Sequence, residues 1–336
     1  MKSLPRIRFA HLPTPIEPLP RLSAALQGPR LWVKRDDQTG LAFGGNKTRK
    51  LEFLVAEAEA HGARTLITAG AAQSNHCRQT AAAAARFGFN CILVLSGPKP
   101  ETTSGNLLLD HLLGVEIVWV ERENRASALQ KTFEQAWEEG KRPYKIPVGG
   151  SNPTGAAGYA YAIQEMISQF PVEELPDWIV MPSSSGGTQA GMVAGAKLFN
   201  YPGKILGISN DETAPHLSTY VAKLANETLE SFGEEASVKS EDVLVNDDFL
   251  GEGYGMMGKT DEEAIRLFAT QEGLLLDPVY TGRVAAGLIA LIKAGFFKPG
   301  EKVLFWHTGG SPALFAEEYR SQIADVEKKP SHLRKQ

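Results

Sequence analysis

Short apolar runs that alternate with helical segments constrain the fold of this chain more than any other feature. The runs are four to six residues long, and they cover residues 31–34, 65–68, 91–95, 115–120, 144–147, 178–181, 205–208 and 303–306. Between them, apolar residues recur at helical spacing. Strands that alternate with helices are typical of a parallel sheet covered by helices on both faces. A second alternating set, after the glycine-rich stretch 149–155, indicates a second sheet, and we expect the chain to pass between two domains near residue 150.

Composition excludes several classes of protein. The 336 residues carry a net charge of -4, with 43% hydrophobic and 22% charged residues, which gives no reason to expect nucleic acid or a membrane as a partner. Cys77 and Cys91 fit no CxxC pattern, so neither a disulfide framework nor a metal site is predicted. Residues 1–10 lack the apolar core of a signal peptide, and no apolar run is long enough to cross a membrane. We therefore expect a cytoplasmic protein.

A lysine follows two glycines and an asparagine at the start of a predicted helix. The segment is Phe43–Leu51, and the helix is predicted over residues 48–61. Lys47 then lies at or just before a helix N-terminus, whose partial positive charge favours the neutral amine. A near-neutral amine is what Schiff-base chemistry with an aldehyde requires. The alternative is a surface lysine beside an ordinary turn.

A second glycine-rich turn follows an apolar strand and precedes a helical segment. It contains Ser185, Gly186, Gly187, Thr188 and Gln189. Small residues in that context allow several backbone N–H groups to point at one phosphate. The segment is neither GxGxxG nor a P-loop, so a single phosphate is favoured over a dinucleotide or a nucleoside triphosphate. The alternative is a plain turn between a strand and a helix.

Three further segments place polar side chains next to strand ends or tight turns. Ser74 and Asn75 lie between a strand and a helix, where helix capping is their ordinary role. Tyr254 and Tyr280 lie among glycine or proline residues, where a tyrosine can stack or transfer a proton. Thr308 follows the last strand, at the end where open α/β sheets bind ligands. An amine, a phosphate cradle and these hydroxyl groups together suit pyridoxal 5'-phosphate, although a cofactor-free sugar-phosphate site is not excluded.

Six ordered motifs resemble the D-cysteine desulfhydrase and 1-aminocyclopropane-1-carboxylate (ACC) deaminase family of pyridoxal-phosphate enzymes. They are residues 34–37 (KRDD), 44–50 (GGNKTRK), 73–76 (QSNH), 185–188 (SGGT), 277–282 (DPVYTG) and 307–310 (HTGG). The resemblance covers nearly the whole chain. It implies fold-type II, with two three-layer α/β/α domains and mostly parallel sheets. Residues 51–155 would form the smaller domain, and residues 1–50 with 156–336 the larger, cofactor-binding domain. The active site would lie in the cleft between them.

The resemblance also implies a role for each candidate residue. Lys47 would bind the cofactor aldehyde and act at the substrate Cα, with Ser74 near that carbon or the substrate carboxylate. Asn75 would bind the cofactor ring oxygen. The phosphate would be held by Ser185, Gly186, Gly187, Thr188 and Gln189. Thr281 would face the ring nitrogen, Thr308 would also contact the cofactor, and Tyr254 and Tyr280 would flank the substrate. A homodimer is also implied.

Position 281 separates the activities of this family. Deaminases of the family typically carry a glutamate where this chain has Thr281. A threonine leaves the ring nitrogen unprotonated, which gives a weaker electron sink and favours β-elimination over cyclopropane opening. We therefore expect a β-eliminating lyase that converts D-cysteine to pyruvate, ammonia and sulfide.

Four alternatives remain open at this point. An L-cysteate sulfo-lyase, which expels sulfite, comes second, and its pocket would need extra donors for the sulfonate. His76 and Arg78 follow Ser74 and Asn75 in the sequence, but Arg78 is expected to be a solvated charge. ACC deaminase comes third. A non-enzymatic carrier or regulator that binds the cofactor without turnover is kept as a different class, and the cofactor-free sugar-phosphate binder is the fourth alternative.

Overall fold

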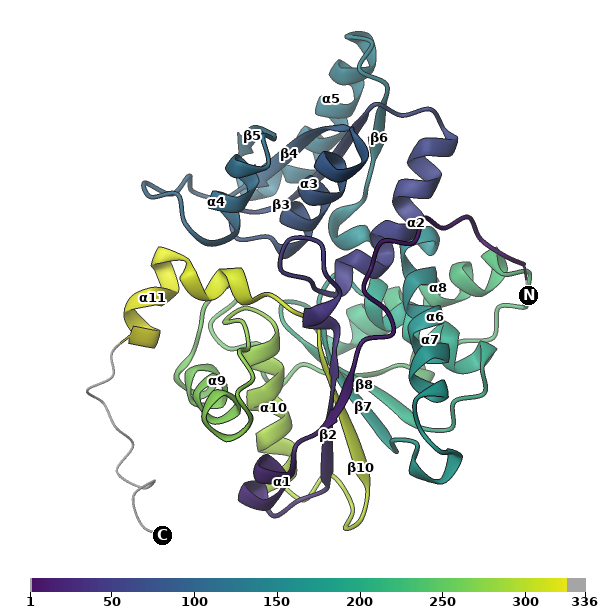
Figure 1. Ribbon diagram of the computed structural model, residues 1–336, viewed down its shortest axis with the longest axis vertical. Helices are drawn as coiled ribbons and strands as arrows, with labels where there is room; N and C mark the ends of the chain where they lie inside the picture. The colour runs from purple at the N-terminus through teal and green to yellow at the C-terminus, as the bar shows by residue number, and fades with distance from the viewer. Residues whose placement is uncertain (1, 325–336) are drawn as a thin grey trace.

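Two sheets, one of six strands and one of four, organise the computed structural model, which describes residues 2–324 (Figure 1). The larger sheet has the order β1-β2-β10-β7-β8-β9, with β1 antiparallel to β2 and all other pairs parallel. Its strands are β1 (Ile16–Pro18), β2 (Arg30–Arg35), β7 (Trp178–Ser183), β8 (Lys204–Ser209), β9 (Leu244–Asn246) and β10 (Lys302–His307). The fold is therefore the mostly parallel α/β architecture that the alternating pattern predicts.

The smaller sheet is wholly parallel, with the order β5-β4-β3-β6. Its strands are β3 (Thr65–Ala71), β4 (Asn90–Ser96), β5 (Glu116–Val120) and β6 (Pro143–Lys145). All four lie between residues 65 and 145, whereas the larger sheet draws its strands from before residue 36 and after residue 177. The predicted domain boundaries at residues 50/51 and 155/156 both fall inside helices, α2 (Asn46–Ala60) and α6 (Pro153–Ser168).

Helices cover both faces of each sheet. Besides α2 and α6, the helices are α1 (Pro20–Leu26), α3 (Asn75–Phe87), α4 (Gly105–Leu112), α5 (Arg125–Glu138), α7 (Gly187–Leu198), α8 (Ala214–Ser231), α9 (Lys259–Glu272), α10 (Thr281–Lys293) and α11 (Glu317–Ala324). In Figure 1, α6, α7 and α8 lie on one side of the larger sheet, and α9 and α10 lie on the other. This arrangement explains why the strands are apolar along their whole length.

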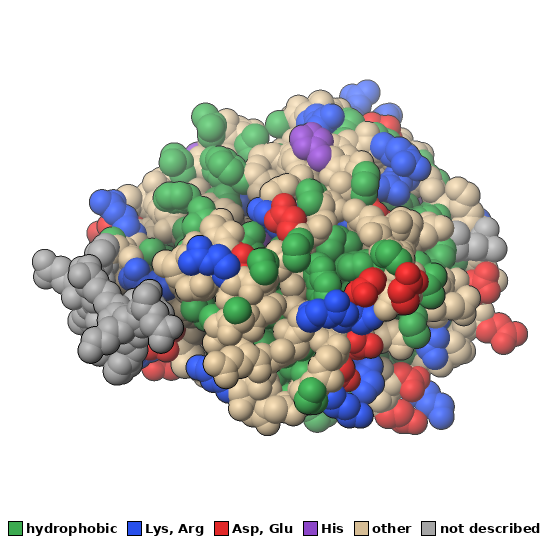
Figure 2. Space-filling view, turned by 60° about the horizontal axis from the view of Figure 1, so that its bottom comes forward, with side chains coloured by type: hydrophobic (Ala, Val, Ile, Leu, Met, Phe, Trp, Pro, Cys, Tyr) green, Lys and Arg blue, Asp and Glu red, His purple; other side chains and the backbone are tan. Residues whose placement is uncertain are grey.

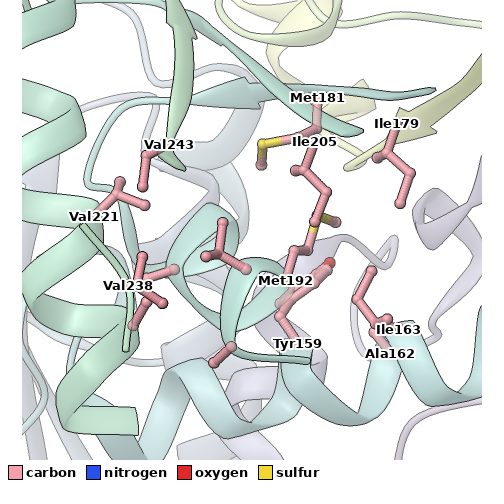
Figure 3. Close-up of a cluster of buried hydrophobic side chains, with 14 of the residues drawn as sticks. Tyr159, Ala162, Ile163, Ile179, Met181, Met192, Ile205, Val221, Val238 and Val243 are labelled. Carbon is pink, nitrogen blue, oxygen red and sulfur yellow. The ribbon is translucent and has the colours of Figure 1, made fainter. Parts of the chain in front are cut away.

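Alternate residues of each central strand enter different cores. On β7, Ile179 and Met181 pack with α6, α7 and α8 in the cluster of Figure 3, while Trp178 and Val180 pack with the side chains of α9 and α10. Successive side chains of a strand point to opposite faces of the sheet, so a parallel strand buried on both faces must be apolar at both odd and even positions. In the smaller sheet, Leu93 faces α3 and Val94 faces α5 in the same way.

Two local sequence patterns predict the structure incorrectly. The polar stretch 211–248 suggests a mostly helical region, but it contains strand β9 as well as helix α8. Thr260 and Glu263 have the spacing of a capping box, but helix α9 begins after Gly258, whose N–H donates to Asp261 at 2.9 Å.

Helix α2 is tied to the larger sheet by a buried ionic cluster. Arg49 donates to Asp36 at 2.8 and 2.9 Å and to Glu165 at 2.8 and 2.9 Å, and Lys34 donates to Glu165 at 2.7 Å. Burial alone would raise the pKa of Asp36, but Arg49 and Lys34 lower it to about 2. Further along, α2 contributes Leu51, Leu54 and Val55 to the core of the smaller sheet, so one helix belongs to both halves of the molecule.

The surface is mixed in charge. On the face drawn in Figure 2, Lys and Arg side chains are interspersed with Asp and Glu. Within residues 2–324, no helix is long and apolar enough to cross a membrane.

Candidate active site

A cleft of about 520 Å³ lies where segments of both sheets meet. Strand–helix junctions supply much of its wall: the β3–α3 loop contributes Ser74 and Asn75, and the β7–α7 loop contributes Ser185. In parallel sheets these junctions lie at the carboxyl ends of the strands, where ligands bind. The volume suits a small organic cofactor with a small substrate.

Lys47 lies in the first turn of α2 and borders the cleft. Its amine donates to Asn46 Oδ1 at 3.2 Å, and its backbone N–H donates to Gln79 Oε1 at 3.2 Å. Desolvation lowers the pKa of Lys47 to about 8, with a further lowering from Arg78 and an opposing effect from Asp277. At pH 7 roughly a tenth of the amine is then neutral, far more than for an ordinary lysine. The predicted position of Lys47 at a helix N-terminus is correct.

The turn before Lys47 requires glycine at two positions. Gly44 and Gly45 have φ values of 63° and 125°, and a Cβ on Gly44 would lie 2.1 Å from the carbonyl oxygen of Asp37. The same turn is fixed by the N–H of Asn46, which donates to the carbonyl of Thr308 at 2.9 Å. The backbone around the reacting amine is thus held by the larger sheet.

Asn75 presents a hydrogen-bond donor to the cleft. Its Oδ1 accepts from Asn106 Nδ2 at 2.9 Å, so its amide NH2 remains available. The neighbouring Ser74 caps α3, because its Oγ accepts from the N–H of Cys77 at 3.1 Å. Ser74 therefore has the capping role that its sequence context favours, and it also borders the cleft.

The β7–α7 turn forms an anion cradle. Ser185, Gly186 and Thr188 line the cleft, and α7 begins directly behind them. A Cβ on Gly187 would lie 2.6 Å from Ser151 Oγ, so no larger residue fits there without displacing that side chain. Ser183 Oγ is buried in the cleft wall and has no hydrogen-bond partner among the described residues. A ligand with several acceptor oxygens would satisfy such donors.

Two tyrosines share a hydrogen bond in the cleft wall. The hydroxyl oxygens of Tyr254 and Tyr280 are 2.5 Å apart. Desolvation raises the pKa of Tyr254 to about 12, and it also raises the pKa of Tyr280. Both phenols are therefore protonated at neutral pH, so they serve as donors and not as bases.

Asp277 fixes the position of Tyr280. Its carboxylate accepts from the N–H groups of Val279, Tyr280 and Thr281 and from the hydroxyl of Thr281, at 2.7 to 3.0 Å. The carboxylate thereby satisfies the orphan donors at the start of α10. Asp277 was not among the predicted site residues, although a carboxylate four residues before the first residue of a helix is the signal that could have found it.

Three predicted cofactor residues, Gly187, Gln189 and Thr281, do not border the cleft. Gln189 is fully buried and its side-chain amide donates to the carbonyl of Leu244 at 2.8 Å, so the phosphate contact of this residue stays a prediction. Thr281 is also buried, and its hydroxyl donates to Asp277. The role of Thr281 toward a ring nitrogen stays a prediction. Thr308, in contrast, borders the cleft.

Three ionisable side chains near the amine of Lys47 are buried, which their sequence context did not predict. Lys50 is buried and donates to the carbonyl of Gly149 at 2.9 Å, and burial together with Lys47 lowers its pKa. His76 borders the cleft, and its pKa is lowered by burial and by the two lysines, so the imidazole is neutral. Arg78 is fully buried, and the expectation of a solvated charge is wrong. Because α3 is packed on both sides, helical spacing alone could not predict that Arg78 is buried.

Charged side chains of both signs border the cleft. Arg122 and Arg125 are contributed by the smaller half, and Asp211 and Glu212 by the larger half. The guanidinium of Arg122 lies 6.0 Å from the ring centroid of Tyr254. Within residues 2–324 neither arginine forms an ion pair, whereas Asp211 accepts from Ser184 Oγ at 2.9 Å. The cleft therefore holds two arginines, of which Arg122 lies beside Tyr254, and both interact electrostatically with Asp211.

These residues fit pyridoxal 5'-phosphate. Lys47 offers the amine, the Ser185 turn offers phosphate donors, and Asn75 offers an NH2 for a ring oxygen. Thr308 contributes a hydroxyl on the cleft wall, and this hydroxyl has no hydrogen-bond partner among residues 2–324. When bound, the cofactor supplies an aldehyde and an electron-accepting ring. No group of three or more metal-ligating side chains occurs in the described part of the chain.

Comparisons with known proteins agree with this fit. Residues 7–309 match the family described as "Pyridoxal-phosphate dependent enzyme". A solved structure described as an ACC deaminase homologue superposes with a TM-score of 0.88 at 36% identity, covering 96% of each chain. A hydrogen sulfide-producing enzyme from Fusobacterium nucleatum superposes with a TM-score of 0.61 at 16% identity, covering 89% of this chain and 95% of the other. Threonine deaminase isoform 2 from Solanum lycopersicum gives a TM-score of 0.65 at 18% identity, covering 93% and 82%. The last two show the fold alone.

Proposed function

Because the chain belongs to the family of pyridoxal-phosphate dependent enzymes, with the fold-type II architecture, we propose that it is a β-eliminating lyase acting on D-cysteine. The overall reaction converts D-cysteine and water to pyruvate, ammonia and hydrogen sulfide. Membership in this family sets aside both the cofactor-free sugar-phosphate site and the non-enzymatic carrier. The proposal concerns only which amino acid is consumed and which group leaves.

The tyrosine pair is the observation that carries the proposal. β-Elimination from cysteine breaks the Cβ–S bond, and a proton delivered to the departing sulfur favours that step. Tyr254 and Tyr280 border the same cleft as Lys47 and hold their phenolic protons at neutral pH. Lys47, with its lowered pKa, suits removal of the Cα proton. Ser74 also borders this cleft, which supports the proposal that it contacts the substrate carboxylate or Cα.

Position 281 supports elimination over cyclopropane opening. Thr281 is not a carboxylate, and its hydroxyl proton is directed to Asp277 Oδ1 at 2.7 Å. No acidic side chain at this position is therefore available to keep a ring nitrogen protonated. A weaker electron sink suffices when a good leaving group accepts the electrons.

A second candidate, L-cysteate sulfo-lyase, is favoured by the arginines of the cleft. A sulfonate is a fixed anion that needs donors, and Arg122 and Arg125 border the cleft without ion-pair partners in the described chain. His76 is neutral and adds no positive charge. The carboxylates of Asp211 and Glu212, on the opposite half, partly offset the positive charge of the arginines, and L-cysteate sulfo-lyase is therefore the second candidate.

The test is a product assay with four substrates: D-cysteine, L-cysteine, L-cysteate and ACC. We expect pyruvate with sulfide from D-cysteine, and no turnover by Lys47→Ala, which has lost the reacting amine. Pyruvate with sulfite from L-cysteate would establish the second candidate. In that case Arg122→Gln and Arg125→Gln should raise KM for cysteate, while Arg21→Gln, on the distant helix α1, should not. Formation of 2-oxobutyrate from ACC would overturn the argument from Thr281.

We also propose a cytoplasmic homodimer. Cys77 and Cys91 are both free and buried, which suits a reducing compartment. Leu108, Leu112 and Phe315 are 52%, 80% and 71% exposed on neighbouring segments, an arrangement that suits an intersubunit contact. Sedimentation equilibrium tests the dimer: a monomer at micromolar concentration would exclude it.

A further inference from the structure

Arg78 is a buried cation without a carboxylate in contact. Its side chain on α3 is fully buried, and within residues 2–324 it forms no ion pair. Its Nη2 donates to the carbonyl of Gly44 at 2.8 Å and its Nη1 donates to Asn106 Oδ1 at 3.1 Å, while Nε has no hydrogen-bond partner in the described part of the chain. Burying an arginine in this way costs free energy, so its contacts call for an explanation.

The first contact supports the turn that carries the reacting amine. Gly44 lies three residues before Lys47, in a turn that the larger sheet already holds through the hydrogen bond from the N–H of Asn46 to Thr308. Arg78 approaches the same turn from the smaller half of the molecule. The turn is therefore fixed by both halves.

The second contact reaches the donor for the cofactor ring. Asn106 accepts from Arg78 through Oδ1 and donates to Asn75 Oδ1 through Nδ2 at 2.9 Å. The orientation of the Asn75 amide follows from this bond, because an engaged oxygen leaves the NH2 facing the cleft. One guanidinium thus connects the Lys47 turn to Asn75.

The charge of Arg78 acts on the same amine. The ionisable groups that influence Lys47 are Asp277, before α10, which raises its pKa, and Arg78, on α3, which lowers it. Lys50 and His76 each have their own pKa lowered by Lys47. Without the guanidinium of Arg78, the effect of the Asp277 carboxylate would be less opposed, and the pKa of Lys47 would rise.

We propose that Arg78 is a positioning residue, which fixes the backbone turn of Lys47 and the amide of Asn75 in one geometry. This inference rests on the cofactor chemistry of the family and not on which amino acid is the substrate. It goes beyond the proposed function, because no step of the β-elimination uses Arg78 directly.

The test measures capture of pyridoxal 5'-phosphate by the full-length, cofactor-free chain. The rate at which the visible band of the lysine-bound cofactor appears is followed between about pH 6.5 and 9.5, since only the neutral amine reacts. In Arg78→Gln we expect the midpoint of this profile to move upward by about half a pH unit or more. We also expect kcat to fall about tenfold or more with KM little changed, because a displaced reacting group slows chemistry more than binding.

Arg78→Lys separates charge from geometry. It keeps the positive charge, so the midpoint should return to the wild-type value. It cannot bridge Gly44 and Asn106 as a guanidinium does, so kcat should recover only in part. Asn106→Ala leaves the guanidinium in place and should weaken cofactor affinity without moving the midpoint.

Arg283→Gln is the matched control for loss of a buried guanidinium. Arg283 donates to the carbonyls of Leu250, Gly253 and Met256 and forms an ion pair with Asp261 at 3.5 Å, and it is not among the groups that shift the pKa of Lys47. It should lower the melting temperature without moving the midpoint. The proposal is overturned if Arg78→Gln lowers only the melting temperature, with the wild-type midpoint and kcat retained, or if Arg283→Gln shifts the midpoint equally. The midpoint of cofactor capture and the melting temperature do not depend on D-cysteine turnover, so failure of the proposed function would be recognised separately from failure of this inference.

Discussion

The hydroxyl oxygens of Tyr254 and Tyr280 lie 2.5 Å apart and share one hydrogen bond, although the two residues are 26 positions apart in the sequence. Tyr254 lies in the loop before α9, and Tyr280 directly precedes α10. The ring planes are inclined by 69°, an edge-to-face arrangement that fixes both hydroxyl positions. One phenol donates to the other, so a single proton remains free to be given to a ligand.

The shared proton predicts non-additive effects of the two tyrosines. Tyr254→Phe and Tyr280→Phe should each lower kcat for D-cysteine about 10- to 100-fold, since each removes the same proton-donating unit. The double variant should be little worse than either single variant. Steady-state kinetics of the three variants measures this. Effects that multiply in the double variant would show that the two hydroxyls act independently.

Removing the carboxylate of Asp277 should destabilise the start of α10. Asp277→Asn retains one acceptor oxygen, but it places an NH2 against the N–H groups of Val279 to Thr281. We expect a loss of about 1–2 kcal/mol in the free energy of unfolding, measured by urea denaturation. Asp242→Asn, which alters an exposed cap far from the cleft, should cost less than half as much. Equal losses would argue against a special role for Asp277.

Buried Asp110 predicts a pH-dependent cost to stability. Neither carboxylate oxygen has a hydrogen-bond partner among the described residues, and desolvation raises the pKa of Asp110 to about 8. A carboxyl group with a raised pKa in the folded state costs nothing below its unfolded pKa, and the cost grows as pH rises toward 8. Asp110→Asn should therefore stabilise the protein by about 2 kcal/mol at pH 8 and change little near pH 4. A stabilisation that is constant across this range would contradict the assignment.

Substitution of Ser185 should weaken binding of the cofactor's phosphate group and leave binding of its ring unchanged. Ser185→Ala removes one donor of the cradle, so the Kd for pyridoxal 5'-phosphate should rise about tenfold. The Kd for pyridoxal, which lacks the phosphate, should not change. Ser184→Ala is the neighbouring control, because Ser184 donates to Asp211 instead. A parallel rise for pyridoxal would place Ser185 elsewhere on the cofactor.

The spacing of apolar residues and the residue types found in turns explain which parts of this architecture are predictable. The parallel strands are apolar at both odd and even positions, and Lys47 and Ser74 lie at strand–helix junctions, so short-range sequence patterns are sufficient to predict them. Arg78 and Asn106 act through contacts between segments far apart in the sequence, and no local pattern encodes such contacts. Asp277, in contrast, binds backbone N–H groups two to four residues further along the chain, so a local pattern could have found it. The buried side chain of Gln189 binds the carbonyl of Leu244, 55 residues away, and no local pattern encodes that contact either.

Helix α2 also determines how the two halves of the molecule can move. Its first turns are anchored to the larger sheet through Arg49 and Asp36, and its later turns are packed into the core of the smaller sheet. Lys47 lies at the anchored end. A rotation of one half against the other would therefore pivot near this amine, and the walls of the cleft would travel farther than the nitrogen between them. Substrate could enter and product leave while Lys47, the proposed attachment point of the cofactor, stays in place.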